Sequence, residues 1–411
     1  MNFIQQKHID RSVYYDYKIS RACAIYFIMS VFNATVKTVA PTSSIVSYMS
    51  LVSGGIIFLS YLLCICEVMR RSGRLLINSY MCFGAIYLLS LVLILCRNES
   101  CDLMISGSAF LTFCWWIPIG VFSSSIFDKR IYYEVLLKSS FILLALLAIM
   151  FFFHPLTKYD EFGYNMFFGY NMVIPTIFHL NELIKYKKKK YVFLVLAEFI
   201  MLLIYANRGA WMPIIFFIAY RYLFISYKNK SMVISLLSIG ICLMVVFSTL
   251  FFSFVSVYLE DNFGISSRTL ELLLSGEMQS YKSGRDEIWM ISKNMIYDNP
   301  ILGWGLGGEF YHLAEAEGAI PDSTFTPHNG ILQNLVNFGV IGGFIASIMF
   351  IKPYFQLSRI KDSSYFDLCL IFGSIIIANF YSASGFFIKP ACAIFIYLFY
   401  NYKRWYKYIR L

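Results

Sequence analysis

Charged residues are scarce in this chain. They make up 14% of its 411 residues, while hydrophobic residues make up 59%. A soluble domain contains about 25% charged and about 45–50% apolar residues, so the composition excludes an ordinary soluble protein and predicts an integral membrane protein. The ten cysteines include no C-x-x-C pair of the kind that binds zinc. Cys96 and Cys101 flank a predicted outer loop, and their spacing alone leaves open whether they pair.

The apolar runs also lack the alternation of polar and apolar residues that marks membrane-spanning strands. Instead they are continuous and about 20 residues long, which is the length that crosses a bilayer as an α-helix. The sequence therefore predicts an all-α integral membrane protein with about twelve transmembrane helices. Their centres lie near residues 30, 56, 85, 115, 145, 172, 198, 218, 245, 341, 376 and 394.

The distribution of basic residues predicts the orientation of these helices. With twelve spans and a cytoplasmic N-terminus, most of the 34 lysines and arginines fall in inner segments, as the positive-inside rule requires. Both termini of this multi-pass protein are then cytoplasmic. Contact of the inner segments with membrane lipid headgroups accounts for the formal net charge of +10, so no nucleic-acid partner is expected.

One polar segment interrupts the apolar pattern. Residues 259–329 are acidic and contain many glycines and prolines, and we expect them to form a long extracytoplasmic, catalytic loop that carries short helices. Residues 1–258 are expected to form transmembrane helices 1–9. Residues 330–411 are expected to form helices 10–12 and a cytoplasmic C-terminus.

A helix is predicted in this loop over residues 284–297. Ser283, followed three residues later by Asp286, has the character of a capping box, apolar residues then recur at helical spacing, and Pro300 follows the end of the run. Arg285 lies in the first turn, where free backbone N–H groups and the helix dipole favour an anion. A bound phosphate would explain a cation at this position, and a salt bridge to a neighbouring acid is the alternative.

Nine basic residues fall on or near the outer side, against the general bias. Arg208 lies in a very short joint between predicted spans seven and eight. Its guanidinium is suited to bind a phosphate in the outer leaflet, and extension towards lipid headgroups is the alternative. The nine residues are Lys37, Arg97, Lys158, Arg208, Arg268, Lys282, Arg285, Lys293 and Lys389.

Two further ionisable residues are candidates for a role in chemistry. His328 lies between Pro327 and Asn329, just before predicted span ten. A neutral imidazole there could take a proton from a substrate hydroxyl, and a hydrogen-bonded structural histidine is the alternative. Glu198 lies in span seven, about 15 Å below the outer face by helix rise, so pairing with a polar neighbour is favoured over a direct role in chemistry.

A cluster of glycines follows the predicted loop helix. It comes after a helix stop rather than after a strand, and it lacks the Gly-Lys-Ser/Thr ending of a nucleotide-binding loop. Tight backbone packing is therefore the expected role of this cluster. Its members are Gly303, Gly305, Gly307 and Gly308.

Together, these residues resemble the O-antigen polymerase and ligase family of bacterial envelope-glycan enzymes. The resemblance covers roughly residues 205–343, and residues 1–200 carry no matching motif. The motifs are Asn207-Arg208-Gly209-Ala210, Ser283-Gly284-Arg285 with Trp289, Asn299-Pro300-Ile301-Leu302-Gly303-Trp304-Gly305, and His328-Asn329 followed after nine residues by Gly339-Val340-Ile341-Gly342.

The resemblance implies a metal-independent glycosyltransferase of the GT-C type that needs no nucleotide or other cofactor. Its donor would be a glycan linked to undecaprenyl pyrophosphate. By the roles of the family, Arg208 and Arg285 hold and neutralise the pyrophosphate, and His328 activates or positions the acceptor hydroxyl for attack with inversion. Further candidate substrate-binding residues are Lys37, Arg268, Asn329 and Lys389.

Within this family we interpret the chain as an O-antigen, or surface polysaccharide, polymerase at the periplasmic face of the bacterial inner membrane. Trp289 and the 299–305 stretch are more similar to those of polymerases. The alternative is an O-antigen ligase that transfers the glycan to lipid A-core, and a transporter or flippase is a third class. Expected partners are membrane lipids, the lipid-linked oligosaccharide, and a chain-length regulator and flippase of the same pathway.

Overall fold

The computed structural model is built from helices. Within the residues it describes, every regular element is helical, which confirms the all-α part of the expected fold. The described positions are residues 3–40, 43–97, 102, 104–153, 166–205, 210–225, 257–258, 261, 285–316, 318, 320, 326–357, 363–382 and 393–401.

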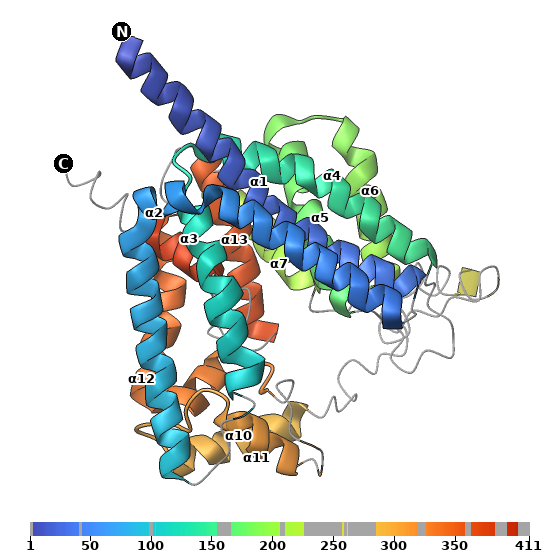
Figure 1. Cartoon of the computed structure of the whole chain (residues 1–411). Coiled ribbons are helices and arrows are strands. Elements are labelled where there is room, and N and C mark those ends of the chain that lie inside the picture. Colours follow the sequence, from blue (N-terminus) through green and yellow to red (C-terminus); the bar gives the residue numbers. More distant parts are fainter. Residues whose placement is uncertain are drawn as a thin grey trace. The chain divides into compact units, whose positions relative to one another are not determined.

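The chain forms two compact units, each assembled from separated stretches of sequence. The first comprises Met1–Cys23, Ser60–Tyr133 and Lys282–Leu411, and the second comprises Ala24–Leu59 and Glu134–Tyr281. Three long helices, which are labelled in Figure 1, contribute residues to both units. They are α1 (Phe3–Val39), α2 (Ser43–Cys96) and α4 (Lys129–Phe153).

The other helices each lie within one unit. The second unit contains α5 (Met166–Tyr186), α6 (Lys190–Tyr205) and α7 (Trp211–Ile225). The first unit contains two short π-helical segments, η1 (Met104–Ala109) and η2 (Thr112–Trp116), and the helices α3 (Ile117–Ser125), α10 (Arg285–Asp298), α11 (Gly308–Ala316), α12 (Gly330–Leu357) and α13 (Ser363–Ser382).

The helices coincide with most of the predicted membrane spans. Eleven of the twelve predicted centres fall in described helical residues, and the centre near residue 245 lies outside the described part of the chain. The twelve-span count and the GT-C type stay predictions. By length and composition, four described segments could cross a membrane: Ser12–Val39, Ser44–Cys96, Lys129–Phe153 and Gly330–Met349.

The predicted second and third spans form a single helix. α2 is 54 residues long and has a kink at Ser72, where φ is −140° and ψ is 21°. The sequence assigns the basic segment around Arg70, Arg71 and Arg74 to the inner side of the membrane. In the structure this segment is the kinked middle of α2.

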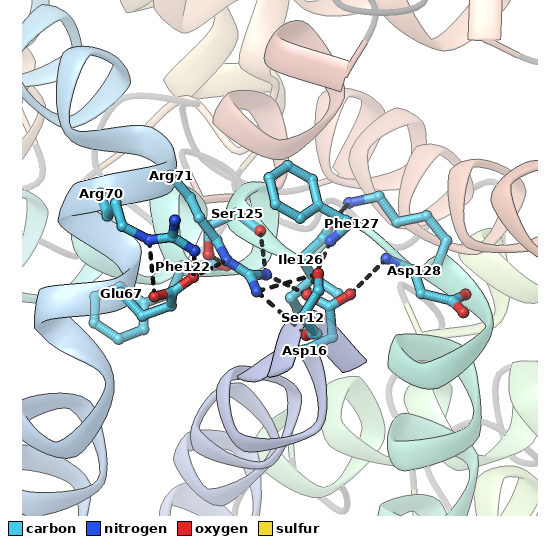
Figure 2. Close-up of polar contacts among 11 residues, drawn as sticks. Ser12, Asp16, Glu67, Arg70, Arg71, Phe122, Ser125, Ile126, Phe127 and Asp128 are labelled. Atoms are coloured by element: carbon cyan, nitrogen blue, oxygen red, sulfur yellow. Dashed lines mark hydrogen bonds and ion pairs between the residues drawn. The ribbon is translucent and has the colours of Figure 1, made fainter. Parts of the chain in front are cut away.

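A buried ion-pair cluster fixes the kink (Figure 2). Arg71 and Asp16 form an ion pair whose side chains are each 2% exposed, and Arg71 Nε donates to Glu67 Oε1 at 2.6 Å. The Asp16 carboxylate also accepts the backbone N–H groups of Phe127 at 3.1 Å and Asp128 at 2.9 Å. Because a buried charge is costly unless it is paired and hydrogen-bonded, the cluster ties α1, the kink of α2 and the turn between α3 and α4 together.

The second half of α2 has the length of a bilayer. From Ser72 to the end of the helix at Cys96, a rise of 1.5 Å per residue gives about 36 Å, which exceeds the roughly 30 Å hydrocarbon core. The Arg71 cluster and Arg97, which follows the end of α2, are therefore separated by about one membrane thickness. The two arginines are thus far enough apart to lie on opposite sides of a membrane, and the inner location of Arg71 and outer location of Arg97 stay predictions.

In the second unit, a buried polar chain links α4, α5 and α6. His179 Nδ1 lies 2.6 Å from Glu198 Oε1, and His179 Nε2 lies 3.0 Å from Ser140 Oγ. All three side chains are fully buried. The Ser140 hydroxyl donates its single hydrogen to the Leu137 carbonyl oxygen at 2.6 Å, so Nε2 must be the donor towards Ser140.

One proton therefore lies between His179 Nδ1 and Glu198 Oε1, and the two side chains together carry no net charge. The pair is either an imidazolium facing a carboxylate or a neutral imidazole facing a carboxylic acid. Glu198 Oε2 is buried without a hydrogen-bond partner, a cost that is lower for the uncharged acid. The expected pairing of Glu198 with a polar neighbour is confirmed by this geometry.

We expect His179→Ala to destabilise the protein by about 3–5 kcal/mol, because it leaves a buried ionisable group without its partner. Glu198→Gln should cost only about 1 kcal/mol, because its amide can donate to Nδ1 of a neutral imidazole. Thermal unfolding of the purified full chain in detergent checks both variants. Equal destabilisation by the two substitutions would contradict the shared-proton assignment.

Candidate functional site

The loop that follows α10 is paired with a break in α12. At Gly339 the backbone of α12 has φ 68° and ψ −178°, which interrupts the helix. In a continuous helix the N–H of Val340 would bind the carbonyl oxygen of Val336. Here it donates to the carbonyl oxygen of Pro300 at 2.7 Å, and the carbonyl oxygen of Val336 instead accepts the N–H of Trp304 at 2.8 Å.

A third hydrogen bond extends this exchange. The N–H of Gly305 donates to the carbonyl oxygen of Asn337 at 3.0 Å, a group that a continuous helix would have paired with Ile341. Residues 300–305 thus supply partners for the backbone groups that the break releases. The three bonds place the loop directly in the gap of the helix.

Two glycines make this close approach possible. A Cβ atom on Gly339 would lie 2.3 Å from the carbonyl oxygen of Ile301, and one on Gly303 would lie 2.5 Å from backbone atoms of Asn337. Both glycines have a φ of +68°, a region that L-residues with a side chain rarely adopt. The predicted role of the glycine cluster in tight backbone packing is confirmed at Gly303.

Arg97 holds the same loop from the end of α2. Its Nη2 donates to Asn299 Oδ1 at 3.0 Å and to the carbonyl oxygen of Gly303 at 2.7 Å. Its guanidinium carbon lies 4.6 Å from the centre of the Trp304 ring, a cation–π distance. Trp304 Nε1 in turn donates to the carbonyl oxygen of Met295 in α10 at 2.7 Å. The sequence identifies Arg97 as an outer cation, and the structure gives it the role of fixing the loop.

The helix that carries Arg285 is fixed next to His328. α10 begins at Arg285, within one residue of the predicted start. One turn later, Trp289 Nε1 donates to the carbonyl oxygen of Pro327 at 2.8 Å. This single bond holds the first turn of α10 against the residue that precedes His328. Two of the three predicted catalytic residues, Arg285 and His328, therefore belong to segments that the structure joins.

His328 lies at a sharp bend before α12. Its φ of +50° is uncommon for a residue with a side chain, and its side chain is half-buried. Such strained conformations are concentrated at functional sites. Asn329 caps α12, because its Oδ1 accepts the N–H groups of Ile331 at 3.0 Å and Leu332 at 3.1 Å. Substrate binding by Asn329 stays a prediction.

A buried carboxylate joins α11 to α12. Glu309 is fully buried and accepts hydrogen bonds from the Gln333 side chain and from the N–H of Gly307 at 3.0 Å. With the Asn337 amide oriented to satisfy its own hydrogen bonds, its nitrogen donates to Glu309 Oε2 at 2.7 Å and to the carbonyl oxygen of Gly305 at 3.1 Å. Burial raises the pKa of Glu309 to about 7, and these donors oppose part of that rise.

The sequence interpretation did not identify Glu309. The available signal was the polar series Asn329, Gln333 and Asn337 within the otherwise apolar predicted span ten. Residues four apart share one face of a helix, so this series predicts a polar partner for α12.

The remaining predicted site residues are not brought together by the described structure. Lys37 is exposed on the part of α1 that lies in the second unit. Arg208, Arg268, Lys389 and the side chain of Arg285 lie outside the described positions, as does Cys101.

The region that contains this loop and helix matches a known family. A protein-family model described as O-antigen ligase matches residues 192–347. The chain carries a domain of the O-antigen polymerase and ligase family. The resemblance found in the sequence is thereby confirmed, and members of this family are glycosyltransferase-like enzymes. Comparison with curated proteins gave no significant match.

In this O-antigen family domain, we expect Gly339→Ala to disrupt the pairing of the loop with α12. A methyl group there would collide with the Ile301 carbonyl and would also face the unfavourable φ, a combined cost of about 2–5 kcal/mol. Gly318→Ala is the matched control, because Gly318 has a φ of +64° but no heavy atom within 4 Å of a built Cβ. Limited proteolysis and thermal unfolding should detect the change, and equal effects of the two substitutions would contradict the collision.

Glu309 should make stability depend on pH. Its folded pKa of about 7 lies above the usual value of 4.5, so the folded state favours the protonated acid. The corresponding stability is fully present below about pH 4.5 and is lost as the pH rises through about 7, an effect on the order of 3 kcal/mol. The melting temperature of the wild type relative to Glu309→Gln should therefore fall across this window.

The control for this measurement is Glu287→Gln, which changes an exposed carboxylate of α10. This variant should keep the pH profile of the wild type. A difference between wild type and Glu309→Gln that does not vary from pH 4.5 to 8 would refute the raised pKa.

Proposed function

We propose that the chain is a membrane glycosyltransferase of the GT-C type that uses a glycan linked to undecaprenyl pyrophosphate as its donor. The observation that carries this proposal is the Trp289–Pro327 hydrogen bond within the family-matched region. It holds the start of the Arg285 helix next to the His328 bend, so a cation and a base are available on adjoining segments.

In the proposed reaction, an acceptor sugar hydroxyl attacks the anomeric carbon of the donor. His328 takes the hydroxyl proton, a new glycosidic C–O bond forms, and the bond from the anomeric carbon to the pyrophosphate oxygen breaks with inversion. Arg285, at the N-terminal end of α10, adds its charge to backbone N–H groups that already favour an anion. Together with Arg208 it neutralises the departing pyrophosphate.

The other predicted cations are assigned to the same substrate. We propose that Lys37, Arg268 and Lys389 bind the lipid pyrophosphate at the periplasmic surface of the inner membrane. The proposed reaction uses no metal or nucleotide. The proposed location is the bacterial inner membrane, with both termini in the cytoplasm and the 259–329 loop in the periplasm. A flippase and a chain-length regulator of the same pathway are the proposed protein partners.

Within this proposed glycosyltransferase activity, we propose that the chain is a polymerase. The product would be a longer lipid-linked chain of repeat units, and the motif carrying this choice is the 299–305 stretch with Trp289. The second candidate is a ligase that transfers the glycan to lipid A-core. The description of the matching family model as O-antigen ligase favours it.

A deletion strain complemented with variants tests the mechanism and the choice of acceptor. We expect Arg285→Ala and His328→Ala each to reduce glycan transfer at least about 100-fold, with the protein still present in the membrane at normal level. Lys293→Ala, which removes an exposed cation from the same helix, should complement fully. Full activity of Arg285→Ala or His328→Ala would remove that residue from the mechanism.

The phenotype of the uncomplemented strain identifies the product on a lipopolysaccharide gel. Single repeat units attached to the core would indicate a lost polymerase. Bare core together with long chains retained on the undecaprenyl carrier would indicate a lost ligase. Normal chains on the core would reject both candidates. Lipid-linked substrate that accumulates on the cytoplasmic side of the inner membrane would indicate a lost flippase.

A further inference from the structure

The outermost part of the loop after α10 is apolar and exposed. Ile301 and Leu302, here called the loop tip, are 71% and 59% exposed. No residue from 299 to 308 carries a charge. Single exposed aliphatic residues are ordinary on a protein surface, whereas exposed apolar residues that form a contiguous patch mark a contact with a partner or a membrane.

The loop tip lies beside a helix that could cross the membrane. The backbone bonds of residues 300–305 are made to Val336, Asn337 and Val340, which lie six to ten residues into the candidate span Gly330–Met349. At 1.5 Å per residue, this contact is about 9–15 Å from the start of the span. The loop therefore runs alongside α12 at a depth that belongs to the span itself.

The surface of α12 around this contact is exposed and apolar. Val340, whose N–H binds the Pro300 carbonyl oxygen, is 49% exposed, and Ile341 and Phe344 are 67% and 63% exposed. In a membrane span, such residues face lipid. The exposed side chains of the loop tip adjoin this surface, since Ile301 contacts Gly339 directly before Val340.

The polar groups near the loop tip are arranged as a low-dielectric environment requires. Non-helical backbone at membrane depth is tolerated where its N–H and C=O groups are paired within the protein, and the exchange with α12 supplies three such pairs. Tyr297, one turn before the tip, is 80% exposed, and tyrosine is enriched at the boundary between membrane and water.

We propose that the loop tip, Ile301 and Leu302, inserts into the bilayer hydrocarbon next to α12, in the leaflet on the side of α10 and α11. Its partner is the acyl chains of the membrane lipids. Insertion anchors the segment between the Arg285 helix and α12 at the level of the lipid surface. This contact is independent of glycan transfer, and it can be measured without a glycan substrate.

The test places the fluorescent amino acid dansylalanine at position 302 of the full-length chain, reconstituted in vesicles of phosphatidylethanolamine and phosphatidylglycerol. Lipids that carry a doxyl quencher on the acyl chain should quench this probe several-fold more strongly than aqueous iodide does. The matched control is position 320, because Ile320 is an 88% exposed isoleucine of the same loop beyond α11. There iodide should be the stronger quencher. The same measurement at position 301 guards against a probe that disturbs folding.

Three outcomes would overturn the proposal. Strong iodide quenching at positions 301 and 302, equal to that at position 320, would place the tip in water. Protection from both quenchers would mean that protein covers the tip, as in contact with a second copy. Doxyl quenching that is abolished when undecaprenyl phosphate is added would assign the surface to the polyprenyl chain instead of the bilayer.

Discussion

The exchange of backbone hydrogen bonds between residues 300–305 and the broken helix α12 is the interaction on which the candidate site depends. A break within a candidate span releases N–H and C=O groups, and each unpaired buried group costs about 1–3 kcal/mol. The loop pairs the carbonyl oxygens of Val336 and Asn337 and the N–H of Val340. The break in α12 is therefore stable only when the loop is in place, and the loop follows its path only against the broken helix.

The position of the candidate catalytic segments follows from this mutual dependence. α10 leads directly into the loop, and the bend at His328 leads directly into α12, so pairing the loop with α12 also brings these two segments together. The bond from Trp289 to the Pro327 carbonyl oxygen then fixes their contact. Glu309 adds a second connection, because its carboxylate joins α11 to Gln333 of α12. A carboxylate with a raised pKa makes that connection sensitive to pH.

Local sequence patterns predicted much of this arrangement. Contacts between residues that are far apart in the sequence could not be predicted from such patterns. The start of α10 follows from its capping pattern, and the packing role of Gly303 follows from its place after a helix stop. Arg97 could not be assigned in this way, because its partner Asn299 lies 202 positions away. The continuity of α2 through the kink at Ser72 could not be predicted either, because the basic residues there indicate a loop between two spans. The partner that buries Arg71 within the continuous helix is Asp16, 55 positions away.

α2 connects the two ends of the first unit and fixes the distance between the Arg71 cluster and the loop after α10. Arg71 is held at the kink by Asp16 and Glu67, and Arg97, about 39 Å away along the helix, holds Asn299 and Gly303. Both arginines are bound to protein groups, so neither end of this helix segment can slide relative to its partners without breaking charged hydrogen bonds. The rigid length of α2, rather than the loop itself, therefore determines how far the candidate site stands from the Arg71 cluster.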